Sequence, residues 1–227
     1  MPLQAELQEF TTSSPAVASY SYTDIADGTG VVELYGCQSK ETTTPAYFLT
    51  TNVMHPNDVY SQNETPVNPN AGELTKVSDL DFNQSPFNSS RVVKGTFRAQ
   101  VTYAQGASTS SNQSGTSYVV VKLRKYSGST ETDLATATSE TMTVPSLSLL
   151  FNTVNLSAAI TETVFAIGDI LRITVETWAT GQGAGGAGSY ATRTYLYHDP
   201  INTAATSDED TARTTRLLFF VPFKIDL

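Results

Sequence analysis

Alternation of apolar and polar residues is the feature that most limits the folds open to this chain. From Val93 to Tyr103 the odd-numbered residues are apolar or small and the even-numbered residues are polar. This period of two is typical of a strand that buries one face. The chain contains further segments with strand character at 17–22, 31–35, 46–50, 118–126, 134–138, 141–144, 148–154, 170–178, 192–197 and 216–223. We therefore predict an all-β protein.

Helical periodicity is weak along the whole sequence. The nearest approach to a 3.6-residue apolar stripe, 156–164, is interrupted by β-branched residues and predicts at most a short helical turn. About ten strands spaced by about 8–15 residues favour an antiparallel β-sandwich of jelly-roll type. Charged residues make up only 15% of the chain, and Ser and Thr replace them, which suits strands with neutral polar outer faces.

The predicted domain organisation is simple. Residues 1–15 are polar and read as an extended N-terminal arm, and residues 16–227 read as a single β-sandwich domain in which 16–75 could form a sub-layer. The Pro- and Asn-rich stretch from His55 to Gly72 predicts a long surface loop. Loops of this length are more often functional or ordered by a partner than idle.

Charge and hydropathy exclude two classes of partner. The net charge is −9 and the pI about 4.6, whereas nucleic-acid-binding proteins need a basic surface. No stretch reaches the roughly 18–20 apolar residues of a membrane span. The N-terminus has neither a basic start nor an apolar core, so we expect no secretory signal and synthesis in a cytoplasm.

Residues suited to catalysis or metal binding are few and scattered. The two histidines, His55 and His198, are far apart in sequence, and no Gly-x-Ser-x-Gly motif occurs. The glycines of Gly181–Gly188 match a dinucleotide-binding string only through low complexity, because no helix is predicted after them. The single cysteine, Cys37, has no His or cationic neighbour in sequence and is expected to be buried. We predict no enzyme, no cofactor and no metal.

Several short segments of the sequence resemble segments of structural proteins of tailed phages. They are residues 22–30, 34–36, 47–50, 86–88, 91–95 and 216–227. The resemblance implies a virion component made in the host cytoplasm, such as a capsid decoration (cement) protein or a neck or tail accessory. It further implies a jelly-roll fold, a homotrimer and the major capsid protein as partner.

The arm and the long loop are the predicted contacts with the major capsid protein. The candidate partner-binding residues are Leu3, Leu7, Phe10, His55 and Tyr60. The alternative is a carbohydrate- or receptor-binding module of a phage fibre or tail, with its site in the loops Gln105–Gly115 and Gly181–Gly188. A surface-layer module is a third reading, which the lack of an export signal disfavours.

Overall fold

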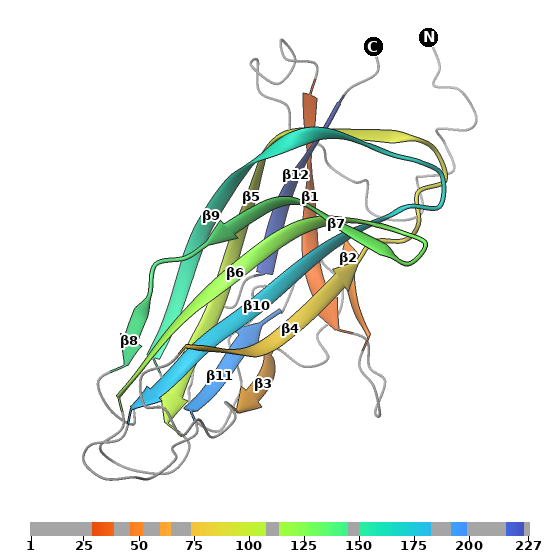
Figure 1. Ribbon diagram of the computed structural model, residues 1–227. Coiled ribbons are helices and arrows are strands. Elements are labelled where there is room, and N and C mark those ends of the chain that lie inside the picture. The colour runs from red at the N-terminus through yellow and green to blue at the C-terminus, as the bar shows by residue number, and fades with distance from the viewer. Residues whose placement is uncertain are drawn as a thin grey trace.

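The computed structural model describes residues 29–38, 46–51, 60–64, 74–107, 114–144, 150–182, 192–198 and 217–224. Every regular element in these ranges is a strand (Figure 1). The strands are β1 (Thr29–Gln38), β2 (Tyr47–Thr50), β3 (Tyr60–Glu64), β4 (Thr75–Asn83), β5 (Arg91–Ala107), β6 (Ser114–Ser127), β7 (Thr130–Thr138), β8 (Met142–Val144), β9 (Leu150–Phe165), β10 (Ile170–Gln182), β11 (Thr192–Tyr197) and β12 (Leu217–Lys224). The all-β prediction is confirmed. The described residues contain no helix that could cross a membrane.

All twelve strands belong to one hydrogen-bonded sheet. Its order is β3-β11-β5-β12-β1-β2-β4-β10-β6-β7, with β9 paired to β5 and β8 paired to β6. Neighbours are antiparallel except β2 and β4, which run parallel where Phe48 lies opposite Asn83. The sheet is therefore mixed and not purely antiparallel as predicted.

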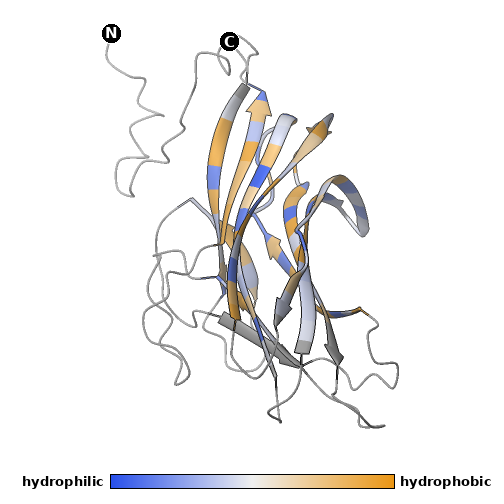
Figure 2. Cartoon of the chain, turned by 90° about the vertical axis from the view of Figure 1, so that its left-hand side faces the viewer, coloured by the Kyte–Doolittle hydropathy of each residue, from blue (hydrophilic) through white to orange (hydrophobic). Residues whose placement is uncertain are grey.

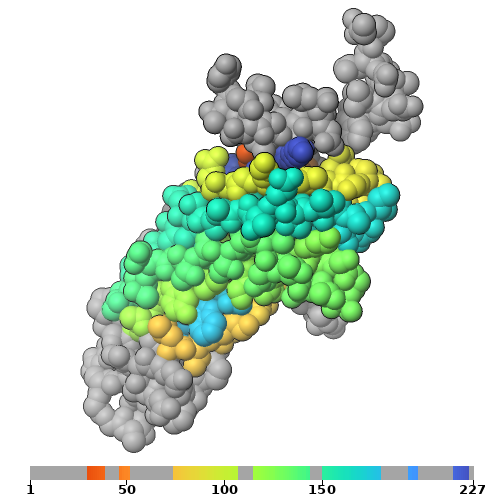
Figure 3. Space-filling view, turned by 45° about the horizontal axis from the view of Figure 1, so that its top comes forward, coloured from red at the N-terminus to blue at the C-terminus, as the bar shows by residue number. Residues whose placement is uncertain are grey.

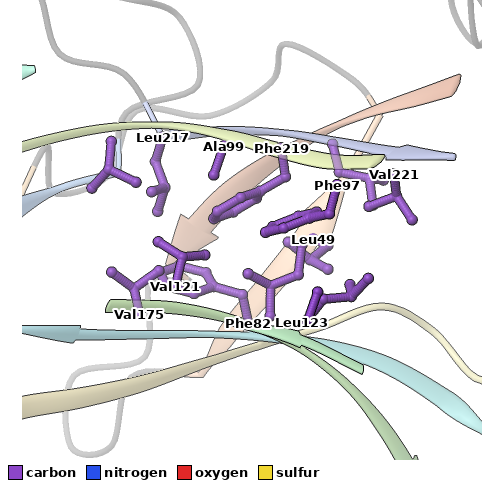
Figure 4. Close-up of a cluster of buried hydrophobic side chains, with 14 of the residues drawn as sticks. Leu49, Phe82, Phe97, Ala99, Val121, Leu123, Val175, Leu217, Phe219 and Val221 are labelled. Atoms are coloured by element: carbon purple, nitrogen blue, oxygen red, sulfur yellow. The ribbon is translucent and has the colours of Figure 1, made fainter. Parts of the chain in front are cut away.

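The sheet folds back so that two groups of strands face each other across the core. Figure 4 shows side chains of β5 and β12 pointing toward those of β4, β6 and β10. Along one side β9 lies between β5 and the β6–β7 pair, so it covers the margin between the two groups (Figure 3).

Alternation along strands such as β5 contributes buried side chains to this core. In β5 the side chains of Val93, Phe97, Val101 and Tyr103 are buried, and Figure 2 shows hydrophobic and hydrophilic residues alternating along the strands. Phe219 lies at the centre, with its ring centre 6.3 Å from those of both Phe97 and Phe82. The two strand groups are thus joined through aromatic contacts.

Gly36 lets β1 lie close to side chains of its neighbour β12 and of β4. A Cβ atom at this position would lie 2.5 Å from Cδ2 of Leu217 and 3.1 Å from Cδ1 of Phe82. Real Cβ atoms do not approach other atoms so closely, and both neighbours are fully buried. A side chain at this position would force these buried neighbours to move.

Three local predictions were wrong. The 156–164 segment forms no helical turn but lies inside β9, which pairs with β5 from residue 91 to residue 105. The stretch predicted as a loop from His55 to Gly72 contains β3, which pairs with β11. The predicted loop tip Gln105–Gly115 is shorter, because β5 extends to Ala107 and β6 begins at Ser114.

Glycines with positive φ stand in two of the turns. Gly128, at the turn between β6 and β7, has φ +62°, and Gly168, at the turn between β9 and β10, has φ +88°. Both values lie in the region that glycine adopts without strain. The N-terminal arm and the predicted strand at 17–22 lie outside the described residues.

Candidate functional site

A groove runs over the outer face of β9, β5 and β12. Cross-strand register builds it from two rows: Arg98 lies between Ser157 and Phe220, and Gln100 lies between Asn155 and Leu218. Side chains at even positions of β5 point away from the core, because the odd positions fill it. The hollow has a volume of about 440 Å³ and is lined by Arg98, Ala99, Gln100, Asn155, Leu156, Ser157, Leu218 and Phe220.

The two walls of this groove differ in chemistry. On the β9 side, Gln100 Nε2 donates a hydrogen bond to Asn155 Oδ1 at 3.0 Å. On the β12 side, Leu218 and Phe220 supply apolar surface, and the guanidinium carbon of Arg98 lies 5.9 Å from the centre of the Phe220 ring. A cation at this distance is attracted to the face of the ring. The groove therefore offers a positive charge and amide groups beside an apolar wall.

Arg98 is the distinctive charge in the groove. Within the described part of the chain, no carboxylate lies within 4.0 Å of its guanidinium group. The next strand, β1, places Glu33 on the same cross-strand row, but on the far side of Phe220. Glu33 Oε1 accepts a hydrogen bond from the Tyr35 hydroxyl at 2.6 Å. Phe220 thus separates the cation from this carboxylate.

The outer face of β4, β10 and β6 is organised differently, around Glu176. Its side chain is 5% exposed and lies 2.7 Å from Lys122 Nζ and 3.6 Å from Lys76 Nζ. Trp178 Nε1 donates to its other oxygen at 2.9 Å. Burial alone would raise the pKa of Glu176, but the hydrogen bonds from Lys122 and Trp178 and the two positive charges outweigh burial and lower the pKa. Glu176 is thus held as a carboxylate.

Two arginines complete the network on this face. Arg124 contacts Asp133 at 2.7 Å and Glu131 at 3.2 Å. Arg172 contacts Asp81 at 3.0 Å and also pairs with Glu131. The charges of this ionic network (Lys76, Asp79, Asp81, Lys122, Arg124, Glu131, Asp133, Arg172 and Glu176) are satisfied among themselves. We assign it to stability.

The turn between β9 and β10 contains a further strongly held carboxylate. Asp169 lies 2.9 Å from Lys125 Nζ and accepts a hydrogen bond from the backbone N–H of Ala166 at 2.6 Å. Hydrogen bonds from Lys125, from Ser127 and from that N–H lower its pKa to about 2. A carboxyl group with this pKa is a poor proton donor at neutral pH. We assign it to the turn.

Of the predicted partner-binding residues, the structure describes only Tyr60. It begins β3, opposite Tyr197 of β11, in a strand and not in the predicted loop. Leu3, Leu7, Phe10 and His55 lie outside the described residues. The structure therefore does not bring this set together, and contact with a capsid protein stays a prediction.

Other residues considered from the sequence are placed as follows. Cys37 is buried, as predicted, and His198 is buried with its ring centre 6.0 Å from that of Tyr47. In the described ranges, no three His, Cys, Asp or Glu residues are grouped so that they could hold a metal ion.

The sequence analysis missed the groove residues. The alternation of β5 indicates that Arg98 and Gln100 face outward, but the sequence does not show which strands lie beside them. Pairing with β9 and β12 creates the site.

The described architecture is that of an all-β unit with a groove on its outer face, and three solved structures align with it. An aminopeptidase from a marine sediment archaeon, Thaumarchaeota archaeon, aligns with 87% of this chain and 37% of its own, at 10% identity and a TM-score of 0.51. A CocE/NonD family hydrolase from Staphylococcus aureus aligns with 84% of this chain and 41% of its own, at 10% identity and a TM-score of 0.36. An α-amino acid ester hydrolase aligns with 64% of this chain and 25% of its own, at 16% identity and a TM-score of 0.37.

The chain spans well under half the length of each of these three proteins. No protein-family model and no curated protein sequence matches it. At 10% identity, the likeness to the aminopeptidase concerns the fold.

The comparisons contradict two predictions made from the sequence. The chain was expected to be a non-enzymatic component of a phage particle, either a capsid decoration protein or a carbohydrate- or receptor-binding module, and to be no enzyme. Both predictions are contradicted by the likeness of the fold to an aminopeptidase, which extends over 87% of this chain at a TM-score of 0.51. The error came from treating a small inventory of titratable residues as a sign of a purely structural role, although a β-fold can form one part of a longer enzyme.

Proposed function

We propose that this chain functions as the β-domain of a hydrolase that cleaves amide or ester bonds, and that its outer groove contacts the substrate. The observation that carries the proposal is the fold likeness to an aminopeptidase, which extends over 87% of this chain but only 37% of the aminopeptidase. A match of this kind is expected when one chain corresponds to one part of a longer enzyme.

The groove supports the second half of the proposal. Substrate sites are concave and mostly apolar, with a few polar groups that fix orientation. The hollow over β9, β5 and β12 has this composition, with Leu218 and Phe220 on one side and Asn155 on the other. The ionic network on the opposite face lacks it, since its charges are paired with each other.

The finer architecture is also part of this proposal. We propose that the folded sheet is a sandwich of jelly-roll type. Two features support this: the strands face each other in two groups, and most strands that are adjacent in the sheet are not consecutive in sequence.

Hydrolysis assays test the proposed function. The full-length product of the gene, with any protein that copurifies with it, is offered aminoacyl p-nitroanilides and p-nitrophenyl esters. We expect turnover of at least one class. The double variant Arg98→Ala/Asn155→Ala should raise KM several-fold and change kcat little, because it removes contacts made before the chemical step.

A matched control separates a local effect from a general loss of charge. Arg91 is exposed on the same strand and does not line the groove, so Arg91→Ala should leave KM unchanged. Absence of hydrolysis of both substrate classes would rule out the hydrolytic role. Hydrolysis with the same KM in the groove variant would show that the groove does not contact substrate.

A further inference from the structure

We infer that the outer groove binds a small ligand that ends in a carboxylate, with an amide bond and an apolar side chain next to it, such as the carboxyl end of a short peptide. This inference rests on the proposed function in one respect, that the groove is where substrate or product lies. Cleavage of an amide or ester bond creates a new carboxylate, so a product of the proposed reaction carries the required group.

The charge in the groove selects for an anion. Arg98 is exposed, and no described carboxylate neutralises it within 4.0 Å. A guanidinium group presents parallel N–H donors that match the two oxygens of a carboxylate. The guanidinium carbon lies 5.9 Å from the centre of the Phe220 ring. The first element of recognition is therefore an Arg–carboxylate pair.

The nearest competing carboxylate is kept away from this site. Glu33 lies two strands from Arg98 on the same row, with β12 between them. Strands are about 4.8 Å apart, so the backbones of the two residues are separated by about 10 Å. The Tyr35 hydroxyl also holds Glu33 at 2.6 Å. The arrangement keeps the acidic side chain on β1 and leaves Arg98 for a ligand.

Amide groups form the second element of recognition. Gln100 and Asn155 occupy the next cross-strand row and are hydrogen-bonded to each other at 3.0 Å. Residues two apart on a strand are separated by about 6.6–6.8 Å along it. A carboxylate held at Arg98 would therefore have its neighbouring amide group near this pair, where the side-chain N–H groups of Asn155 can donate to a carbonyl oxygen.

The size and the apolar wall of the groove define the rest of the ligand. A volume of about 440 Å³ lies in the lower part of the range of about 300–1,000 Å³ that is typical for small-molecule sites. An apolar side chain can pack on Leu218 and Phe220, on the wall opposite the amides. These properties favour one or two residues of a peptide over a long segment.

The net charge of −9 opposes long-range attraction of any anion. At physiological ionic strength this repulsion is screened over about 8 Å, so the local contact with Arg98 decides whether a carboxylate binds. We expect association to weaken at low salt, where screening is less effective. A basic protein would show the opposite salt dependence, with tighter binding of an anion at low salt.

The inference is tested by binding and not by turnover. The full chain is titrated with N-acetyl-L-leucine and, separately, with N-acetyl-L-leucinamide, which differs only in lacking the carboxylate charge, and binding is followed by isothermal calorimetry. We expect the carboxylate to bind about ten-fold more tightly than the amide. Arg98→Gln should weaken carboxylate binding by about three- to ten-fold, the range for an exposed charge-assisted contact, and leave amide binding unchanged.

Two variants make the result specific. Arg91→Gln removes the same charge outside the groove and should leave both affinities unchanged. Arg98→Lys keeps the charge but loses the paired donors, so it should bind the carboxylate with intermediate affinity. All variants should show the thermal midpoint of the wild type, since both arginines are exposed.

Equal affinity for the two probes, or an equal effect of Arg91→Gln and Arg98→Gln, would overturn the inference. The two proposals can fail separately. Selective carboxylate binding without any hydrolysis would overturn the hydrolytic role alone, whereas hydrolysis without selective carboxylate binding would overturn the ligand assignment alone.

Discussion

Replacement of Glu176 by Gln tests the ionic network most directly, because the change removes one charge and almost no volume. The carboxylate is 5% exposed and pairs with Lys122 at 2.7 Å and with Lys76 at 3.6 Å. The amide oxygen of Gln can still accept the hydrogen bond from Trp178 Nε1, so the variant mainly loses the two ionic contacts.

The expected loss follows from the exposure of the partners. A hydrogen bond between charged groups contributes about 1.5–3 kcal/mol, and breaking a fully buried pair costs about 3–5 kcal/mol. Here the Lys122 and Lys76 side chains are 20% and 41% exposed, so both ammonium groups can reach water when Glu176 is lost. We therefore expect Glu176→Gln to lower the free energy of unfolding by about 2–3 kcal/mol at neutral pH.

The pH dependence of this loss has a definite sign. The pKa of Glu176 is lowered in the folded protein: burial acts to raise it, but the contacts with Lys122, Trp178 and Lys76 prevail. A carboxylate of this kind contributes stability above its unfolded pKa, about 4.3, and loses it as the pH falls through the folded pKa. The difference between wild type and variant should thus be full at pH 6–7 and shrink below about pH 4.3.

Urea unfolding at several pH values measures this difference. Glu162→Gln is the matched control, because Glu162 pairs with Lys94 at 3.4 Å with both side chains about half exposed, and it should cost less than about 1 kcal/mol. A loss below about 0.5 kcal/mol for Glu176→Gln at pH 7, or a loss that persists at pH 3, would refute the reasoning.

Four further predictions follow from the described contacts and from the sequence. Gly36→Ala should lower the free energy of unfolding by about 1–3 kcal/mol in urea, because its Cβ would lie 2.5 Å from buried Leu217; an unchanged midpoint would contradict the close approach. Phe219→Ala should cost about 3–5 kcal/mol in the same assay, with Phe219→Leu costing less, as expected for a cavity in the core; equal losses would argue against it. Asp169→Asn should lower the thermal midpoint at neutral pH, because it removes the ion pair with Lys125. The difference from wild type should fade as the pH drops below the unfolded pKa of about 3.9 toward the folded pKa of about 2, because protonation of Asp169 then removes the same ion pair from the wild type. The phage resemblance predicts a trimer, so light scattering during size exclusion should give three times the chain mass of 24.4 kDa, and a monomer mass would refute it.

Strands with strong alternation were predictable from sequence, and strands stabilised mainly by their neighbours were not. In β5, Val93, Phe97 and Val101 reveal the buried face directly. In β9, apolar residues at even positions from Val154 to Ile160 alternate with small or polar residues, and burial follows the same period. The apolar side chains are mostly half-buried, and the full length of the strand is set by its pairing with β5, about 55 residues away. Propensity is a weak guide where long-range hydrogen bonds decide the structure.

The same limit applies to β3 and to the groove. Tyr60–Glu64 is polar, and its pairing with β11 needs only backbone groups. The sequence pattern therefore predicted a loop for this segment. In the groove, alternation gives the outward direction of Arg98, but its neighbours Ser157 and Phe220 come from strands that no local pattern links to β5. Local sequence therefore predicts on which face of the sheet a side chain lies. Its neighbours on that face follow only from the pairing register of the strands.

The two outer faces of the sheet use arginine in opposite ways, and this contrast bears on where a ligand binds. On β6 and β10, Arg124 and Arg172 share carboxylates on β4 and β7, so binding an external anion there would require breaking existing ion pairs. On β5, no described carboxylate lies within ion-pair distance of Arg98, so an anion that binds there breaks no ion pair with a described residue. Substitutions in the ionic network should consequently change stability without changing ligand affinity, and Arg98→Gln should do the reverse. Stability and binding are thus carried by separate faces of one sheet, and a variant that changed both together would argue against this division.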